Sequence, residues 1–234
     1  MPAVATALRV LTGSIVVVLL TAGCQTLDDA GRVIGRADLV NDLATRLDRS
    51  AELTYSAEYQ LPGGRSASIS QAQQPERAAY TYPAGRLTVT AEAITECDTS
   101  ASPATCTRYP PPSPNAPPAT ALFARASANG LVTPPVVVGL LTAAALDAEA
   151  IIEQSDTTIA GRHATCVQVK QVSNAASANF DACITTDGVL GSFTGVVDGS
   201  QIEIAMSRYR DSVDSDAFEL PPGAKMVDRR PDAK

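Results

Sequence analysis

Hydrophobic residues follow two different periods in the first part of the chain. Within residues 37–50 they recur every three or four positions, at Val40, Leu43 and Leu47, which is the spacing of one face of an α-helix. Within residues 53–61 apolar and polar side chains alternate, as they do in a half-buried β-strand. The pattern therefore predicts an amphipathic helix that leads into a β-sheet.

Further alternating segments extend this predicted sheet. They are separated by Pro62-Gly63-Gly64 and by Pro83-Ala84-Gly85, which are residues that favour chain reversal. The extended segments are expected at residues 66–73, 78–82, 87–93 and 105–109. Because short turns join consecutive strands, we expect an antiparallel meander.

Two helices are expected in the middle of the chain, at residues 119–128 and 134–146. Pro134 fits the first turn of the second helix, whose body is apolar on nearly every side and must therefore be buried. The stretch from Pro110 to Pro118 holds six prolines, a composition typical of a stiff polyproline-like loop. We favour such a loop over the alternative, a ligand for an SH3-type domain.

The second half of the chain predicts another meander, whose register follows from its side chains. If Cys166 faces Cys183, the residues opposite each other on the two strands sort into one apolar face and one polar face. A slip of one residue would mix the two faces, so the register is well specified. Asp187-Gly188 and Asp198-Gly199 are expected to form two-residue turns. The expected pairs are Thr165–Ile184, Val167–Ala182, Val169–Phe180, Gln168–Asp181, Lys170–Asn179, Phe193–Ala182, Gly191–Ile184, Gly195–Ile202, Phe193–Ile204 and Gly191–Met206.

These strands collect apolar side chains on one face of the sheet. Glycines between them permit sharp curvature or a close approach, so the face suits a groove for a lipid. The alternative is a plain core face beneath a helix, and the local sequence does not separate the two. The candidate lipid-binding residues are Val167, Val169, Phe180, Ile184, Phe193, Ile202, Ile204 and Met206.

The N-terminus has the parts of a signal peptide. Arg9 is followed by an apolar stretch from Val10 to Leu20 that is too short for a comfortable membrane span. The residues that end at Cys24, Leu20-Thr21-Ala22-Gly23-Cys24, resemble a relaxed bacterial lipobox. The resemblance implies cleavage before Cys24 and acylation of that residue, which would anchor the protein to a membrane. The alternative is an ordinary secretory signal with an incidental cysteine.

The cysteine count agrees with lipidation. Five cysteines are an odd number, which in an exported protein calls for an explanation. If Cys24 is acylated, four remain for two local disulfides, which the spacing predicts to be Cys97–Cys106 and Cys166–Cys183.

Composition and motifs argue against catalysis. The formal net charge of −7 opposes nucleic-acid binding, which depends on Lys and Arg. His163 is the one histidine, so a multi-histidine metal site is excluded, and we interpret it as a surface residue rather than a base. An acidic cluster of Asp211, Asp214 and Asp216 could hold Ca²⁺, but a solvated turn is the favoured interpretation. We expect neither enzymatic activity nor a cofactor or metal.

The predicted order of elements, together with an acylated N-terminus, resembles the LolA-like lipoprotein-carrier fold, in particular the actinobacterial LppX/LprG group. The likeness rests on residues 53–59, 183–190 and 214–224. It implies an α+β fold in which a curved antiparallel half-barrel sheet packs on helices. We expect a signal peptide at residues 1–23, a tether at 24–36, one domain at 37–229 and a tail at 230–234.

The same resemblance implies a function at the cell envelope. The protein would bind or carry a lipid or glycolipid in an apolar cavity, on the extracytoplasmic face of the bacterial cell membrane, anchored through Cys24. The alternative is an envelope interaction or sensory module on the same fold, with a protein partner and no lipid cargo. A large apolar cavity would favour the first and a filled interior the second.

Overall fold

A computed structural model of the protein describes residues 23–111, 120–173 and 175–231. The predicted signal peptide lies almost wholly outside these residues, as do most of the proline-rich stretch and the last three residues of the predicted tail. The chain divides into two units, one up to Leu39 and one from Val40 onward. Helix α2 (Gly23–Asp48) passes through the boundary, and the remaining elements belong to the second unit.

The second unit contains a sheet and short helices. The helical elements after α2 are η1 (Arg49–Glu52), η2 (Pro62–Gly64), η3 (Thr120–Phe123), α3 (Ala124–Ala128), α4 (Pro134–Leu146) and η4 (Ser215–Phe218). The strands are β1 (Tyr55–Leu61), β2 (Arg65–Gln73), β3 (Glu76–Tyr82), β4 (Gly85–Thr90), β5 (Ile94–Asp98), β6 (Thr105–Tyr109), β7 (Ile151–Ile159), β8 (Arg162–Lys170), β9 (Phe180–Thr185), β10 (Leu190–Val197), β11 (Ser200–Arg210) and β12 (Lys225–Asp228).

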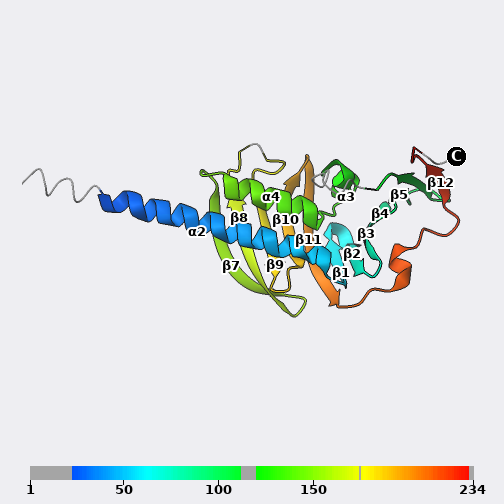
Figure 1. Ribbon diagram of the computed structural model, residues 1–234, viewed down its shortest axis with the longest axis horizontal. Coiled ribbons are helices and arrows are strands. Elements are labelled where there is room, and N and C mark those ends of the chain that lie inside the picture. Colours follow the sequence, from blue (N-terminus) through cyan, green and yellow to red (C-terminus); the bar gives the residue numbers. More distant parts are fainter. Residues whose placement is uncertain (1–22, 112–119, 174, 232–234) are drawn as a thin grey trace, which may run out of the picture. The chain divides into compact units, whose positions relative to one another are not determined.

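Among the described residues, these strands form one sheet in the order β12-β6-β5-β4-β3-β2-β1-β11-β10-β9-β8-β7. The two meanders join where β1 pairs with β11, and every pairing is antiparallel except that of β12 with β6. The sheet is curved, and α4 and the part of α2 from Val40 onward cover one of its faces (Figure 1). The predicted α+β class, with a curved antiparallel sheet packed on helices, is confirmed.

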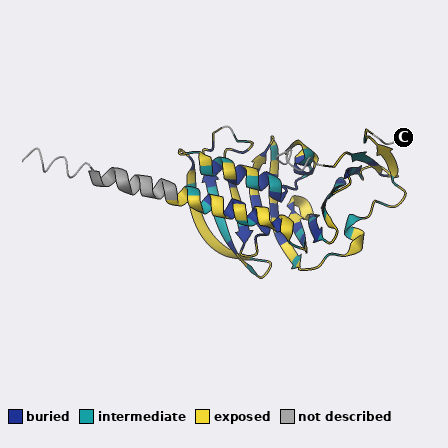
Figure 2. Ribbon diagram, viewed as in Figure 1, coloured by how far each residue is buried: buried dark blue, intermediate teal, exposed yellow. Residues whose placement is uncertain are grey.

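The core lies between the sheet and the helices, as the burial pattern shows (Figure 2). Val40, Leu43 and Leu47 of α2 are buried, as the helical period predicted. Helix α4 begins at Pro134, as predicted, and buries a set of aliphatic side chains. With aromatic residues at only 4% of the chain, aliphatic packing supplies most of this core.

The register of the second meander is confirmed over most of its length. Cys166 lies opposite Cys183, and the Val167–Ala182, Val169–Phe180, Thr165–Ile184 and Gln168–Asp181 pairs are present. Phe193 lies opposite both Ala182 and Ile204, and Gly195 opposite Ile202. The two-residue turn at Asp198-Gly199 forms between Val197 and Ser200. The turn at Asp187-Gly188 is one residue longer than predicted, because Thr185 lies opposite Val189 and leaves residues 186–188 in the loop. Both predicted disulfides, Cys97–Cys106 and Cys166–Cys183, are present as well.

One predicted pair, Gly191 with Ile184, is wrong. The register shifts between Leu190 and Ser192, so Leu190 takes the place opposite Ile184. A β-bulge of this kind inserts a residue that alternation cannot reveal. A side chain at Gly191 would meet the tip of Ile159 at 3.0 Å and the Cys183 carbonyl oxygen at 3.2 Å.

Further differences concern element boundaries. The strand expected at residues 87–93 ends at Thr90, and residues 91–93 turn the chain into β5, which was not predicted. Residues 24–36 were expected to be a tether, but they belong to helix α2, which begins at Gly23. Strand β7 was not predicted, since its residues show no alternation between buried and exposed positions. Strand β12 was not predicted either, and it adds a parallel partner to β6 close to the C-terminus.

Candidate functional site

The eight candidate lipid-binding residues lie on one face of strands β8 to β11, as the sequence predicted. Each exposes 3% or less of its surface, so the face is fully covered. The residues are Val167, Val169, Phe180, Ile184, Phe193, Ile202, Ile204 and Met206.

Two phenylalanines form the aromatic part of this face. The rings of Phe180 and Phe193 stack with centroids 5.9 Å apart. Gly195 lies against both, because a Cβ atom there would approach Phe180 Cβ at 2.9 Å and Phe193 Cζ at 3.2 Å. The glycine predicted to notch the face therefore makes room for the ring stack.

Tyrosines continue the apolar face onto β1 and β3. Tyr55 and Tyr59 of β1 and Tyr80 of β3 are almost completely buried. Burial raises the pKa of all three phenols, because a charged phenolate would lose its hydration. The sequence analysis placed Tyr55 and Tyr59 on the apolar face of a strand but did not connect them to the candidate face.

Little empty space remains between the sheet and the helices where α4 begins. The cavity at this place has a volume of about 40 Å³ and is lined by residues that include Leu47, Tyr55, Tyr80, Pro134 and Val138. Small-molecule sites usually have volumes of about 300–1,000 Å³. That cavity lies beside β1–β3, and the eight residues on β8–β11 expose 3% or less of their surface. The face is therefore the core beneath a helix in this arrangement, and an acyl chain would need part of the helical cover to move.

Helix α4, which lies over the apolar face of the sheet, is attached to it by apolar contacts. Val136, Val137, Leu140, Leu141 and Ala144 are buried, and the hydroxyl of Thr142 donates within the helix to the Val138 carbonyl oxygen. None of the described side-chain hydrogen bonds or ion pairs joins the helix body to the sheet.

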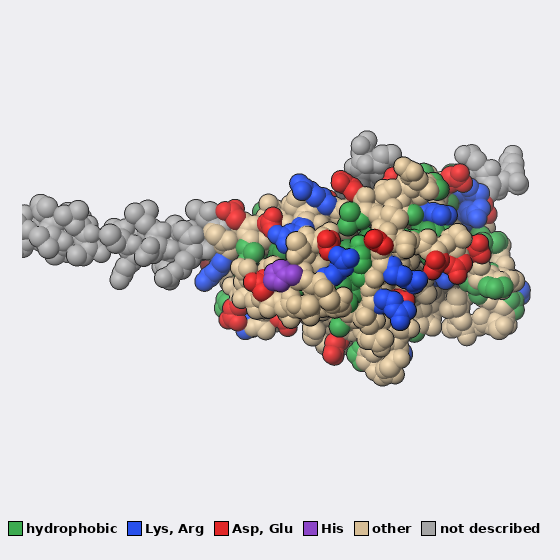
Figure 3. All heavy atoms as spheres, turned by 90° about the horizontal axis from the view of Figure 1, so that it is seen from below, with side chains coloured by type: hydrophobic (Ala, Val, Ile, Leu, Met, Phe, Trp, Pro, Cys, Tyr) green, Lys and Arg blue, Asp and Glu red, His purple; other side chains and the backbone are tan. Residues whose placement is uncertain are grey.

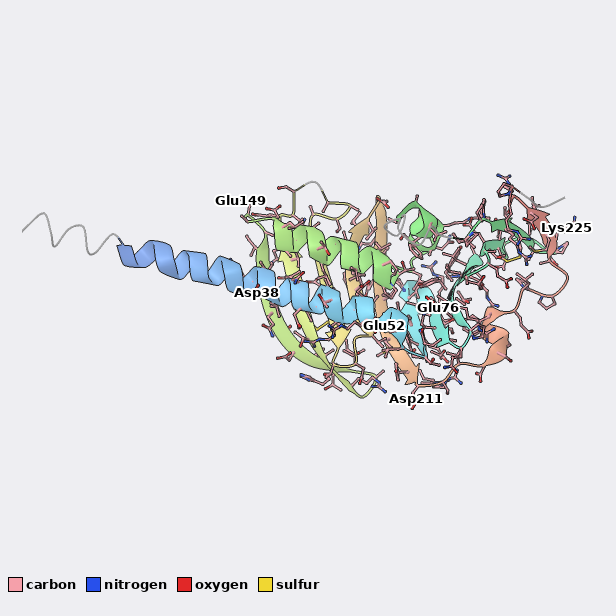
Figure 4. All side chains as sticks on the ribbon, in the orientation of Figure 1. Asp38, Glu52, Glu76, Glu149, Asp211 and Lys225 are labelled. Atoms are coloured by element: carbon pink, nitrogen blue, oxygen red, sulfur yellow. A yellow bond between two sulfur atoms is a disulfide. The ribbon has the colours of Figure 1, made fainter. Side chains whose placement is uncertain are left out.

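Polar contacts hold the chain just beyond the C-terminal end of α4. The Asp147 carboxylate accepts hydrogen bonds from the backbone N–H groups of Ser173 and Glu149, and these bonds lower its pKa. Leu146, one residue earlier, exposes 83% of its surface. Figure 4 shows Glu149 beside this end of the helix. The helix is thus pinned near one end and packed by apolar contacts along its body.

A polar cluster closes the rim of the sheet near the end of β11. Arg162, at the start of β8, forms an ion pair with Asp187 in the turn after β9. The same guanidinium lies 3.7 Å from the centre of the Tyr209 ring. The cluster connects the β7–β8 hairpin to β11, a contact that the sequence did not predict.

Two larger hollows open to solvent. Their lining includes outward-facing side chains of the strands, which alternate along each strand with buried ones. One, of about 440 Å³, includes Gln168, Lys170 and Thr194 in its lining. The other, of about 380 Å³, includes Ser68 and Arg210. Acidic and basic side chains are interspersed over the surface in Figure 3, and neither hollow shows a cluster of one charge.

The other candidate residues are not assembled into a site. His163 is exposed, with Nε2 3.9 Å from Asp156 Oδ1. Asp211 follows β11 (Figure 4), and Asp214 pairs with Arg210 at 3.3 Å. No group of acidic, histidine or cysteine side chains suited to a metal ion occurs among the described residues. Cys24 lies within α2, in the part where only the backbone is described.

Comparisons with known proteins give weak likenesses. No model of a known protein family matches the chain, and no curated protein matches it. An uncharacterized conserved protein from Thermus thermophilus is 12% identical, with a TM-score of 0.46 over 80% of this chain and 98% of that one. MucB is 10% identical, with a TM-score of 0.46 over 77% of this chain and 62% of that one.

MucB in complex with MucA(peri) matches with 11% identity and a TM-score of 0.43 over 80% of this chain and 62% of that one. This chain therefore spans less than two thirds of the MucB chain. Within the part of the chain that the structure describes, no helix combines the length and apolar character needed to cross a membrane.

Proposed function

We propose that the protein is a cell-envelope lipoprotein of the LppX/LprG type that binds the acyl chains of a lipid or glycolipid. The ligand would lie between the apolar face of β8–β11 and helix α4. The protein acts as a binding or carrier protein, without a cofactor and without a catalytic reaction.

One observation carries this proposal. The eight apolar residues form a continuous face, and the helix body that lies over this face is joined to it by apolar contacts. Moving such a helix breaks no described side-chain hydrogen bond or ion pair of its body. The apolar surface that it uncovers would be covered again by an acyl chain, which restores about 0.8 kcal/mol per buried CH₂ group.

Acylation of Cys24 gives the protein its place at the membrane. Several acyl chains anchor a protein stably, whereas one gives marginal binding. A Cys24→Ala variant should leave the membrane fraction or retain its signal peptide, and it should lose metabolic labelling by a fatty acid. Unchanged labelling and unchanged partition into detergent would contradict this part of the proposal.

A second candidate function is supported by the filled interior. The eight residues of the apolar face expose 3% or less of their surface, which leaves no room for an acyl chain beside them in the present arrangement. The same fold could therefore serve as an envelope interaction or sensory module that binds a protein partner and carries no lipid.

A titration with cis-parinaric acid, a fluorescent acyl-chain probe, tests the first function. The protein is first freed of bound lipid, and saturable binding of the probe is the expected result. Ile204→Ser, on the apolar face, should weaken binding, whereas Val196→Ser should not, because Val196 exposes 45% of its surface. If the delipidated protein binds no probe, the lipid-binding function is wrong and the second candidate remains.

A further inference from the structure

Strand β7 has a free edge in the part of the chain that the structure describes. It is the last strand of the sheet, and its backbone pairs with β8 alone. The strand also approaches β11, and the Ile159 side chain at its end lies beside Gly191 of β10. None of its nine residues, from Ile151 to Ile159, is buried, and Figure 2 shows the strand as largely exposed. A terminal strand of this length presents a row of unpaired backbone groups.

The disulfide at Cys166 indicates which backbone groups point outward. The Cα atoms of Cys166 and Cys183 are 3.9 Å apart, which is the close spacing of a pair without mutual backbone hydrogen bonds. The N–H and C=O groups of Cys166 therefore point the other way, to Ser155, its partner on β7. Alternate residues of β7 then direct their N–H and C=O groups away from the sheet: Ile152, Gln154, Asp156 and Thr158.

Strand β7 lacks most of the features that protect exposed edges. Natural edge strands are blunted by lysine, proline, bulges or short length. The sequence Ile-Ile-Glu-Gln-Ser-Asp-Thr-Thr-Ile contains no lysine or proline, and its pairing with β8 continues for nine residues without a register shift. Two acidic residues, Glu153 and Asp156, are its only charges.

We propose that β7 pairs antiparallel with β7 of a second copy of this chain, around a two-fold axis at Ser155. This register uses the whole strand, since it brings all four outward-pointing residues of each copy into hydrogen-bonded pairs. Ile152 pairs with Thr158 of the second copy, and Gln154 pairs with Asp156 of the second copy. A two-fold contact must be self-complementary, and the strand meets this requirement.

The side chains of β7 fit the same register. The two ends of the strand match, because Ile151 of each copy lies opposite Ile159 of the other. Glu153 faces Thr157 of the second copy, so no carboxylate lies directly opposite another. A shift of two residues would instead place Asp156 opposite Asp156 of the second copy, which like-charge repulsion disfavours.

The resulting dimer is weak, because one added strand pair is a small interface. Stable interfaces bury about 1,200–2,000 Å² in total. We expect association in the micromolar range or above, and we expect it to depend on the free edge alone. The inference does not depend on lipid binding.

Sedimentation of the full chain in detergent micelles, over about 1–500 μM protein, tests the proposal. The wild-type chain should shift from monomer to dimer as its concentration rises. Gln154→Pro should remain folded and monomeric, because proline removes an N–H that points outward and is tolerated at such edge positions. Gln154→Thr is the matched control and should dimerise like the wild type.

Asp156→Asn provides a second test that leaves the fold unchanged, since Asn can still accept the hydrogen bond from the Thr165 hydroxyl. In the proposed register the two Asp156 side chains are diagonal neighbours, about 7–8 Å apart. Removing their repulsion should lower the dissociation constant about threefold. A wild-type chain that stays monomeric throughout, or a dimer unaffected by Gln154→Pro and Asp156→Asn, would overturn the proposal.

Discussion

The hydroxyl of Tyr59 donates a buried hydrogen bond of 2.8 Å to the carbonyl oxygen of Leu190. The two residues are 131 positions apart in the chain, and they connect the first meander to the bulge in β10. The register between β9 and β10 shifts at this bulge, and the phenol donates to the backbone beside the shift. The bond thus lies at the place where the predicted register fails.

Tyr59→Phe should destabilise the protein by about 0.5–1.5 kcal/mol, because it removes a buried hydrogen bond. Urea denaturation followed by circular dichroism measures this change. Tyr109→Phe is the control, since Tyr109 is half-exposed at the end of β6 and should change stability by less than about 0.5 kcal/mol. Equal effects of the two substitutions would contradict the role given to the bond.

The buried tyrosines predict a loss of stability at high pH. Burial raises the pKa of Tyr55, Tyr59 and Tyr80 above the ordinary value, and raises that of Tyr82 to about 12. Above about pH 10 the unfolded chain loses these protons while the folded chain keeps them. Stability is therefore complete below pH 10 and falls by about 1.4 kcal/mol per pH unit for each such tyrosine above it.

Absorbance at 295 nm and circular dichroism between pH 9 and 12 check this expectation. The phenols should ionise together with unfolding. If every tyrosine titrates near pH 10 while the dichroism stays native, the buried positions of these residues are wrong.

Removal of the Cys166–Cys183 disulfide should destabilise the protein by about 3 kcal/mol, because a loop of this size loses its restraint in the unfolded state. The cysteines are 17 positions apart. The double variant Cys166→Ala/Cys183→Ala, compared with the wild type by urea denaturation, gives the value. Non-reducing peptide mapping should recover the Cys166–Cys183 and Cys97–Cys106 peptides, and a Cys97–Cys166 peptide would refute the register of the second meander.

Gly195→Ala should disturb the stacked rings of Phe180 and Phe193, since the new methyl group has no space beside them. Overpacking of this kind costs about 1–3 kcal/mol. Gly139→Ala is the matched control, because nothing lies within 4 Å of a Cβ atom there and alanine favours a helix over glycine by about 0.5–1 kcal/mol. Thermal unfolding should move in opposite directions for the two variants.

The sequence was most informative where one face of a strand is buried and the other is not. In β8 and β9 the alternation of side chains, together with two cysteines, specified the register, because a slip would have exposed Val167 and Val169. Strand β7 carries no such alternation, so its place in the sheet depends on backbone pairing with β8 and could not be inferred.

Other features depend on contacts that are distant in sequence. The bulge at Gly191 is stabilised by Tyr59, which local alternation around β10 cannot reveal. The helical state of residues 24–36 was missed because apolar residues are few there and give no strong period. The sequence also left open whether the apolar face is a groove or a covered core, since that depends on how closely α4 packs upon it.

Lipid recovery from the purified full-length protein tests the proposed function most directly. Extraction with organic solvent removes non-covalent lipid but leaves acyl chains attached to Cys24, and mass spectrometry identifies and counts the extracted molecules. We predict about one lipid or glycolipid per protein molecule, with markedly less in an Ile204→Ser variant and an unchanged amount in Val196→Ser. Extracts that contain no lipid in stoichiometric amount, from a folded protein whose Cys24 is acylated, would contradict the lipid-binding account.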